Sequence, residues 1–252
     1  VRPETSARIL LDPKLDIASE LKSGNTRLAD VVVSAIAAVP VRQLPVAQIA
    51  VAVLVLKSLA DNPQVKNTVA PETIRDAAEN LLGAVRTQDL SNETLFRAAS
   101  QLLLAIPSLT TKEEAKRLIA TVEPKTAAAI FLDPRTDVAG AIKSGNVALA
   151  DVLTNLLAGA PVTQLPVTQV SVATQALRSI AENPRVQSEV PAQAVRDTAV
   201  KLVEALAPQL TEKALQSASE QDKESVTAAA ASLLVSIPTL TSRAETAELF
   251  AK

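Results

Sequence analysis

The sequence predicts an all-α protein built from two tandem homologous helical-bundle repeats, each of about five or six helices. Three observations lead to this expectation. Apolar residues recur with a helical period, one half of the 252-residue chain aligns with the other half, and 45 residues are Ala while only three are Phe. Ala and Leu favour helices, and an apolar stripe with a 3.6-residue period is typical of a helix that packs against a core.

An internal duplication organises the chain. Residues 9–85 align without a gap with residues 130–206, at an offset of 121, and 36 of these 77 positions are identical. Further along, LLLAIPSLT aligns with LLVSIPTLT at an offset of 131, so the second half has gained ten residues, which we place in the polar region 208–225. The repeated unit is far longer than a solenoid repeat. We therefore expect one helical repeat over residues 1–124 and a second over residues 125–252.

The first helices are expected where apolar residues share one face. The first stripe comprises Leu28, Val31, Val32, Ala35, Ile36 and Val39. The next segment opens at Pro45, a residue suited to the first helical turn. It is apolar on nearly every side as far as residue 60, so we expect it to be the central helix of repeat 1. Its counterpart in repeat 2 has a more polar face, which should be wetter, formed by Thr168, Ser171, Thr174 and Gln175.

Later helices show the same stripes in both repeats. One pair of stripes comprises Ile74, Ala78, Leu81, Leu82 and Val85, and Val195, Ala199, Leu202, Val203 and Leu206. Another comprises Leu95, Ala99, Leu102, Leu103 and Ile106, and Val226, Ala230, Leu233, Leu234 and Ile237. The last helix of each repeat begins with a capping box, Thr111 with Glu114 and Ser242 with Glu245. Turn residues at 12–13, 23–25, 62–63 and Pro107 separate these segments.

The composition excludes several classes of function. The formal net charge is −2, and the chain contains no His and no Cys. We therefore expect no metal or haem site of the ordinary kind, no cofactor and no Cys–His nucleophile. A near-neutral balance without a basic block or a glycine-rich phosphate loop predicts no nucleic-acid or nucleotide partner. The longest apolar run, Ile49–Leu56, is too short to span a membrane.

Four repeated motifs could carry chemistry, and each has a simpler structural interpretation. Lys22-Ser23-Gly24-Asn25 and Lys143-Ser144-Gly145-Asn146 could form a Ser–Lys pair, but a helix end followed by a new N-cap is favoured. Asp12 with Asp16, and Asp133 with Asp137, could share Ca²⁺ but are better explained as a turn residue and an N-cap. Arg75-Asp76 and Arg196-Asp197 are expected to form solvated or inter-repeat ion pairs. Glu113-Glu114 is expected to complement a helix dipole. We predict no catalytic residue.

One sequon could mark a surface site. Asn92-Glu93-Thr94 matches the N-glycosylation pattern. The chain also opens with VRPETS, without Met and without a signal-peptide pattern, and we expect it to be a processed form, a fragment or a segment of a larger polypeptide.

The order of turns and helices resembles a known module. LKSLADNPQVKNTVAPETIRDAAENLLGAV followed by SNETLFRAASQLLLAIPSL is echoed by LRSIAENPRVQSEVPAQAVRDTAVKLVEAL. This pattern resembles the helical segments of the receptor-for-egg-jelly region of polycystin-1-like surface proteins, and related helical modules of adhesion-receptor ectodomains. The resemblance covers about two-thirds of the chain. It implies a non-catalytic, extracellular interaction or spacer role within a larger protein.

Two functions from different classes remain. The first is a non-catalytic structural or adhesive module of a cell-surface or extracellular protein, whose partners are other protein chains and which could self-associate through its tandem copies. The second is an all-α carrier that binds an apolar ligand or lipid among its Ala, Val and Leu side chains. An enzyme that uses only carboxylates or a Ser–Lys pair is the minor alternative.

Overall fold

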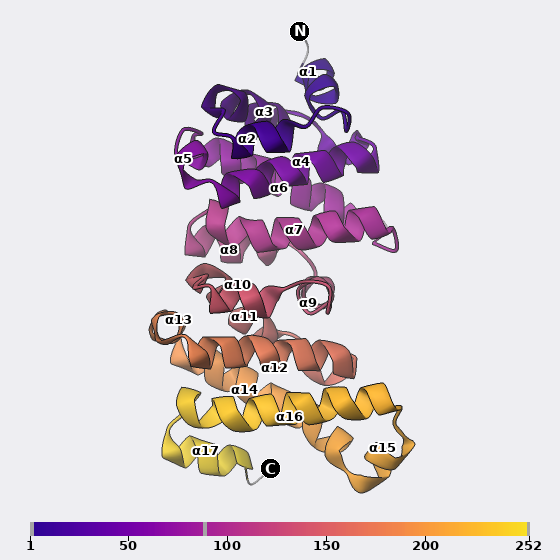
Figure 1. The fold of residues 1–252 in the computed structure, drawn as a ribbon, viewed down its shortest axis with the longest axis vertical. Coiled ribbons are helices and arrows are strands. Elements are labelled where there is room, and N and C mark those ends of the chain that lie inside the picture. Colours follow the sequence, from indigo (N-terminus) through magenta and orange to yellow (C-terminus); the bar gives the residue numbers. More distant parts are fainter. Residues whose placement is uncertain (1–2, 88–89, 251–252) are drawn as a thin grey trace. The chain divides into compact units, whose positions relative to one another are not determined.

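The computed structural model describes residues 3–87 and 90–250, and every regular element within them is helical (Figure 1). The described residues hold seventeen α-helices and three short 3₁₀-helices, and no strand. The prediction of an all-α fold is thereby confirmed. The chain divides into two compact units, Val1–Val122 and Glu123–Lys252, which are called unit 1 and unit 2 below.

The described part of unit 1 contains eight α-helices, which is more than the five or six expected. The additional ones, α1, α2 and α5, have 8, 6 and 4 residues, and a hydrophobic period cannot be recognised over one or two turns. The eight helices are α1 (Pro3–Leu10), α2 (Ile17–Lys22), α3 (Thr26–Ala38), α4 (Val46–Asp61), α5 (Pro63–Lys66), α6 (Pro71–Thr87), α7 (Glu93–Leu109) and α8 (Lys112–Ile119).

Helix α4 lies at the centre of unit 1, as expected. It packs against α2, α3, α6 and α7. Ile49, Val53 and Leu56 are fully buried, whereas Leu54 is 39% exposed, so one edge of this apolar helix reaches the solvent. Pro45 is the N-cap of α4 rather than a first-turn residue.

Unit 2 has the same order of elements with two additional ones. Helices α9 to α14 each begin 121 residues after α1 to α6, and α17 begins 131 residues after α8. The 3₁₀-helix Ala207–Leu210 and helix α15 have no counterpart among the described residues of unit 1. The helices of unit 2 are α9 (Pro124–Phe131), α10 (Val138–Lys143), α11 (Val147–Gly159), α12 (Val167–Glu182), α13 (Pro184–Glu189), α14 (Ala192–Leu206), α15 (Glu212–Ser217), α16 (Glu220–Leu240) and α17 (Arg243–Phe250).

Most of the predicted core positions are buried, but two are wrong. Val31 is 55% exposed and Leu234 is 57% exposed. The apolar arc of α3 is wider than the face its neighbours cover, so the core is formed instead by Ala29 and Val33 together with Val32 and Ile36. Periodicity identifies the apolar side of a helix, but it does not tell which part of a broad apolar side is covered.

Only part of the polar face predicted for α12 is exposed to solvent. Gln175 is exposed as expected, but Ser171 is 8% exposed and Thr174 is fully buried. The Thr174 hydroxyl donates to the carbonyl of Ser171 at 2.8 Å. A hydroxyl that bonds back to its own helix can be buried without an unsatisfied donor.

Pro107 does not separate two helices, contrary to expectation. It lies inside α7, which continues to Leu109, and Pro238 lies in the same way inside α16. A proline this close to a helix C-terminus removes a single backbone donor. The Thr110 N–H donates to the Ile106 carbonyl at 3.1 Å, so the helix closes normally after Pro107.

Candidate functional site

The repeated Lys-Ser-Gly-Asn segments join two helices and do not form a Ser–Lys pair. Gly24 and Gly145 have φ values of 100° and 99°, a left-handed conformation that Gly adopts without strain. The hydroxyls of Ser23 and Ser144 donate at 2.8 Å to a backbone carbonyl three residues earlier. The Asn residues that follow are the N-caps of α3 and α11. The interpretation as a helix end and a new cap is confirmed in both units.

The paired aspartates are used by the backbone. Asp12 accepts from the Lys14 N–H at 2.9 Å, and Asp16 caps α2; Asp133 and Asp137 repeat this arrangement in unit 2. Hydrogen bonds from Arg135 also lower the pKa of Asp133. In the described part of the chain, no group of three or more Asp, Glu, His or Cys side chains is arranged to hold a metal ion.

Ion pairs at the aligned arginines differ between the units. Arg75 contacts Asp76 at 2.8 Å, and hydrogen bonding to that carboxylate raises the pKa of Arg75. Arg196 contacts Glu245 of α17 at 3.0 Å. The carboxylate of Asp197 accepts from the Gln193 side chain at 2.7 Å. These side chains are 30–53% exposed, which agrees with the solvated reading.

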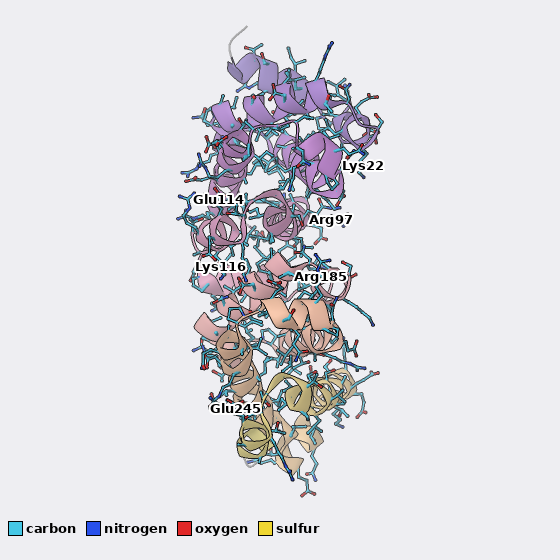
Figure 2. The ribbon with its side chains drawn as sticks, turned by 90° about the vertical axis from the view of Figure 1, so that its left-hand side faces the viewer. Lys22, Arg97, Glu114, Lys116, Arg185 and Glu245 are labelled. Carbon is cyan, nitrogen blue, oxygen red and sulfur yellow. The ribbon has the colours of Figure 1, made fainter. Side chains whose placement is uncertain are left out.

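Both predicted capping boxes are present. Glu114 accepts from the Thr111 N–H at 3.2 Å, and Glu245 accepts from the Ser242 N–H at 2.8 Å. These hydrogen bonds, first from the backbone and then from the hydroxyls, lower the pKa of both carboxyl groups. Figure 2 labels the two glutamates, each in the last helix of its unit. Their ionised form therefore has a structural role.

Asn62, which was expected only as a turn residue, and its aligned residue Asn183 each tie two helices together. The Asn62 side chain accepts from the Val65 N–H and so caps α5, while its amide donates at 3.4 Å to the last carbonyls of α2. Asn183 does the same in unit 2, donating to the Lys143 carbonyl at 3.2 Å. The repeated Asn-Pro dipeptide was the available signal, because Asn caps a helix whose first residue is Pro.

Asn92 of the sequon is exposed and is the N-cap of α7. Its Oδ1 atom accepts from the Leu95 N–H at 3.2 Å. A glycan would be linked through Nδ2, so the cap and the modification use different atoms of the same amide.

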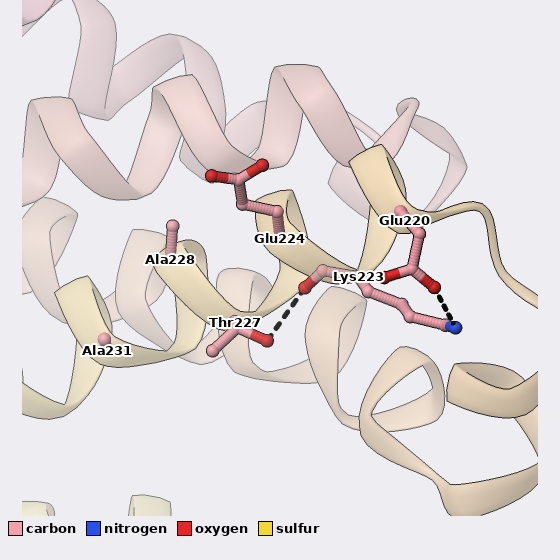
Figure 3. A pocket seen from close by; sticks show the side chains of 6 residues that line it. All are labelled: Glu220, Lys223, Glu224, Thr227, Ala228 and Ala231. Carbon is pink, nitrogen blue, oxygen red and sulfur yellow. Dashed lines mark hydrogen bonds and ion pairs between the residues drawn. The ribbon is translucent and has the colours of Figure 1, made fainter.

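Two hollows lie beside α16. The first, of about 570 Å³, is lined by Glu220, Lys223, Glu224, Thr227, Ala228 and Ala231, all from one helix (Figure 3). Its polar groups bond to each other: Lys223 contacts Glu220 at 2.6 Å, and the Thr227 hydroxyl donates to the Lys223 carbonyl at 2.8 Å. The second, of about 540 Å³, lies between α10, α12 and α16 and includes the Arg178–Glu182 ion pair. Neither has the enclosed apolar lining typical of a small-molecule site.

Comparison with family models, with curated proteins and with solved structures finds no match to this chain. Function must therefore be argued from its own residues. The candidate Ser, Asp and Asn side chains are engaged in caps and turns, and Lys143 contacts Glu182 at 3.5 Å at the edge of the second hollow. No helix in the described part of the chain is both long enough and apolar enough to cross a bilayer.

Proposed function

We propose that the chain is two tandem copies of one helical unit and serves as a non-catalytic structural or adhesive module of a larger cell-surface or extracellular protein, acting through contacts with other protein chains. The proposal is supported by the repetition of the same helices in both units, while the motifs repeated among the described residues serve as caps and turns. The same helices recur at the offset found in the sequence. The asparagines and aspartates that the two copies share cap these helices. This role agrees with the one implied by the resemblance to receptor-for-egg-jelly helical segments.

An extracellular location is supported by the sequon. Asn92 is exposed, and its cap leaves Nδ2 as the atom for a glycan. Asn92→Asp retains a cap acceptor but removes the amide, so it is a matched control for the modification alone. The sequon lies in the tryptic peptide 87–97. In protein from its native source, we expect this peptide to carry a mass increment of sugar-sized steps that the variant lacks.

The role in protein contacts is tested by native mass spectrometry of the same material. We expect complexes whose additional masses are those of polypeptides, beyond the 26.3 kDa of the chain. A small non-covalent adduct that is released on denaturation would contradict the proposal and favour the apolar-ligand carrier, which otherwise stays a prediction. A hydrolase activity that disappears in the Ser23→Ala, Ser144→Ala double variant would contradict the non-catalytic assignment.

A further inference from the structure

The second hollow beside α16 lies wholly within unit 2. Its volume is about 540 Å³, which is in the size range of small-ligand sites, and its walls come from α10, α12 and α16. It shares Ala228 and Ala231 with the first hollow, so the two adjoin along α16 (Figure 3). Charged and hydroxyl groups line it, in contrast to an apolar cavity, so its ligand should be polar.

One side of this hollow carries a surplus positive charge. Arg178 contacts Glu182 at 2.7 Å, and Lys143 contacts the other oxygen of the same carboxylate at 3.5 Å. Hydrogen bonding to Arg178, together with the charge of Lys143, lowers the pKa of Glu182, so all three groups are ionised. Two cations thus share one carboxylate. An anionic oxygen would be attracted here, whereas an ammonium group would be repelled by both cations.

Two nearly buried hydroxyl groups lie in the same wall. Ser179 and Ser232 are each 6% exposed and line the hollow. The residue aligned with Ser179 is Ser58, whose hydroxyl donates to the Leu54 carbonyl at 2.9 Å. Among the residues that the structure describes, neither Ser179 nor Ser232 has a partner for its hydroxyl. Since a buried hydroxyl without a partner is unfavourable, both should bond to a polar molecule in the hollow.

The burial of Ser179 arises from contacts within its own unit. Helix α12 packs on α10 and α16, as the aligned helix α4 packs on α2 and α7. Ser58, at the aligned position of α4, is 1% exposed. The same position is therefore buried in both units, but only in unit 1 does its hydroxyl bond to its own helix.

Smaller side chains make room in unit 2. The aligned pairs that show this change, with the residue of unit 1 first, are Arg97 and Ala228, Gln101 and Ser232, and Ser19 and Gly140. The charged positions keep their sign, in the pairs Lys22 and Lys143, Lys57 and Arg178, and Asp61 and Glu182. Unit 2 thus combines the charged cluster with less bulk around it, as a ligand site requires.

We propose that this hollow binds a sugar acid, whose carboxylate lies between the two cations while its hydroxyl groups bond to the two serines and to Glu182. The inference rests on the proposed function, because it adds a carbohydrate ligand to the adhesive module. A carboxylate matches the surplus positive charge, and sugar hydroxyls match side chains that donate and accept. The small side chains of Ala228 and Ala231 leave space for the sugar ring.

The test is isothermal titration calorimetry of the full chain with added glucuronate. Arg178→Gln removes one cation of the cluster. Lys57→Gln is its matched control, because it removes the aligned cation of unit 1 from a similarly exposed ion pair. Ala228→Leu fills the hollow at an exposed position. Ser179→Ala removes a hydroxyl that has no internal hydrogen bond to lose, so binding should weaken while the melting temperature stays unchanged.

We expect glucuronate to bind the wild type and Lys57→Gln equally, and to bind Arg178→Gln about tenfold more weakly, the effect of one charge-assisted hydrogen bond. Ala228→Leu should not bind it. Propionate lacks the hydroxyl groups and glucose lacks the carboxylate, so each should bind about tenfold more weakly than glucuronate, or less. Equal binding of the methyl glycoside of glucuronate would indicate the end of a glycan chain as the source. Binding of the free acid alone would indicate a free sugar acid.

Four results would overturn the inference: no binding of glucuronate to the wild type, equal effects of Arg178→Gln and Lys57→Gln, unchanged binding to Ala228→Leu, or binding of propionate or glucose as tight as that of glucuronate. None of them bears on the contacts with other protein chains, which native mass spectrometry tests separately. A lack of polypeptide complexes there would count against the proposed function without changing the calorimetry.

Discussion

The two units have the same order of helices but fill their cores with different chemistry. Three core positions that are aliphatic in unit 1 carry Thr in unit 2, and all six residues are buried. The pairs are Val33 and Thr154, Val53 and Thr174, and Ala77 and Thr198. Each Thr hydroxyl donates to a carbonyl three or four residues earlier in its own helix. A helix can therefore bury hydroxyl groups wherever a carbonyl of its own backbone accepts from them.

A second contrast concerns the C-terminal ends of α3 and α11. In unit 1 the Asn80 amide donates to the carbonyl of Ile36 at 2.8 Å. In unit 2 the aligned residue is Lys201, whose ammonium reaches the carbonyl of Ala160 at 3.1 Å. The free carbonyls at a helix end need donors, and either an amide or an ammonium supplies them. The structural role is therefore retained although the residue differs.

The largest effect is expected from breaking the core of unit 1. Leu56→Asp places a charge at a fully buried position of the central helix, where no partner for the charge is provided. We expect the free energy of unfolding to fall by about 4 kcal/mol or more. Leu54→Asp, on the same helix and 39% exposed, should cost far less. Thermal melting of both variants checks the contrast, and equal losses would contradict the assigned orientation of α4.

The second-largest effect on stability is expected at Asn62 and Asn183, each of which joins two helices. Asn62→Ala removes the cap of α5 together with the donor to the α2 carbonyls, and we expect a loss of about 2 kcal/mol. Asn62→Asp keeps the acceptor and loses only the donor, so its effect should be smaller. The same pair of substitutions at Asn183 should behave alike. Urea unfolding of the four variants measures these differences in stability. An Ala variant as stable as the wild type would contradict the role of the asparagine as both cap acceptor and donor to the preceding helix.

Exchanging the aligned core residues sharpens the comparison of the two units. Val53→Thr in unit 1 should cost about 1 kcal/mol, because a methyl is replaced by a hydroxyl that can still bond to its own helix. Thr174→Val in unit 2 should be neutral or stabilising, because a methyl of similar shape replaces the hydroxyl and the Ser171 carbonyl remains an acceptor of the helix backbone. Urea unfolding measures both. A large loss for Thr174→Val would mean that its hydroxyl does more than bond to its own helix.

The smallest effect concerns pH. The pKa values of Glu114 and Glu245 are lowered in the folded state, so their contribution to stability is present above the unfolded value of about 4.3 and is lost as the pH falls through the folded pKa. The Glu114→Gln, Glu245→Gln variant keeps both capping boxes but does not titrate there. Between pH 7 and pH 3 its melting temperature should fall less than that of the wild type. Parallel curves would contradict the role of these carboxylates.

The fold and its caps could be predicted from the sequence because they depend on local rules. Thr111 with Glu114, and Gly24 between two helices, are patterns whose geometry is fixed by a few neighbouring residues. The exposure of Val31 and Leu234 could not be predicted in this way. Both have the period of a core residue, and whether such a residue is covered depends on packing that is remote in sequence.

For the candidate sites too, local roles could be predicted from the sequence and long-range contacts could not. The roles of Ser23 and Asp16 follow from adjacent residues and were predicted, whereas the contact of Arg196 with Glu245 joins residues far apart in the chain. The burial of Thr174 was missed because its polarity indicated solvent, although its own helix satisfies the hydroxyl. Sequence patterns therefore determine most of the local structure, and long-range packing determines which apolar face is left open.

The most direct test of the helix orientations is hydroxyl-radical footprinting of neighbouring apolar residues on the same helix. We expect strong labelling of Val31 and Leu234, which are 55% and 57% exposed, and weak labelling of Val33 and Leu233, which are 0% and 4% exposed. Equal labelling within each of these two pairs would contradict the assigned orientation of α3 and α16.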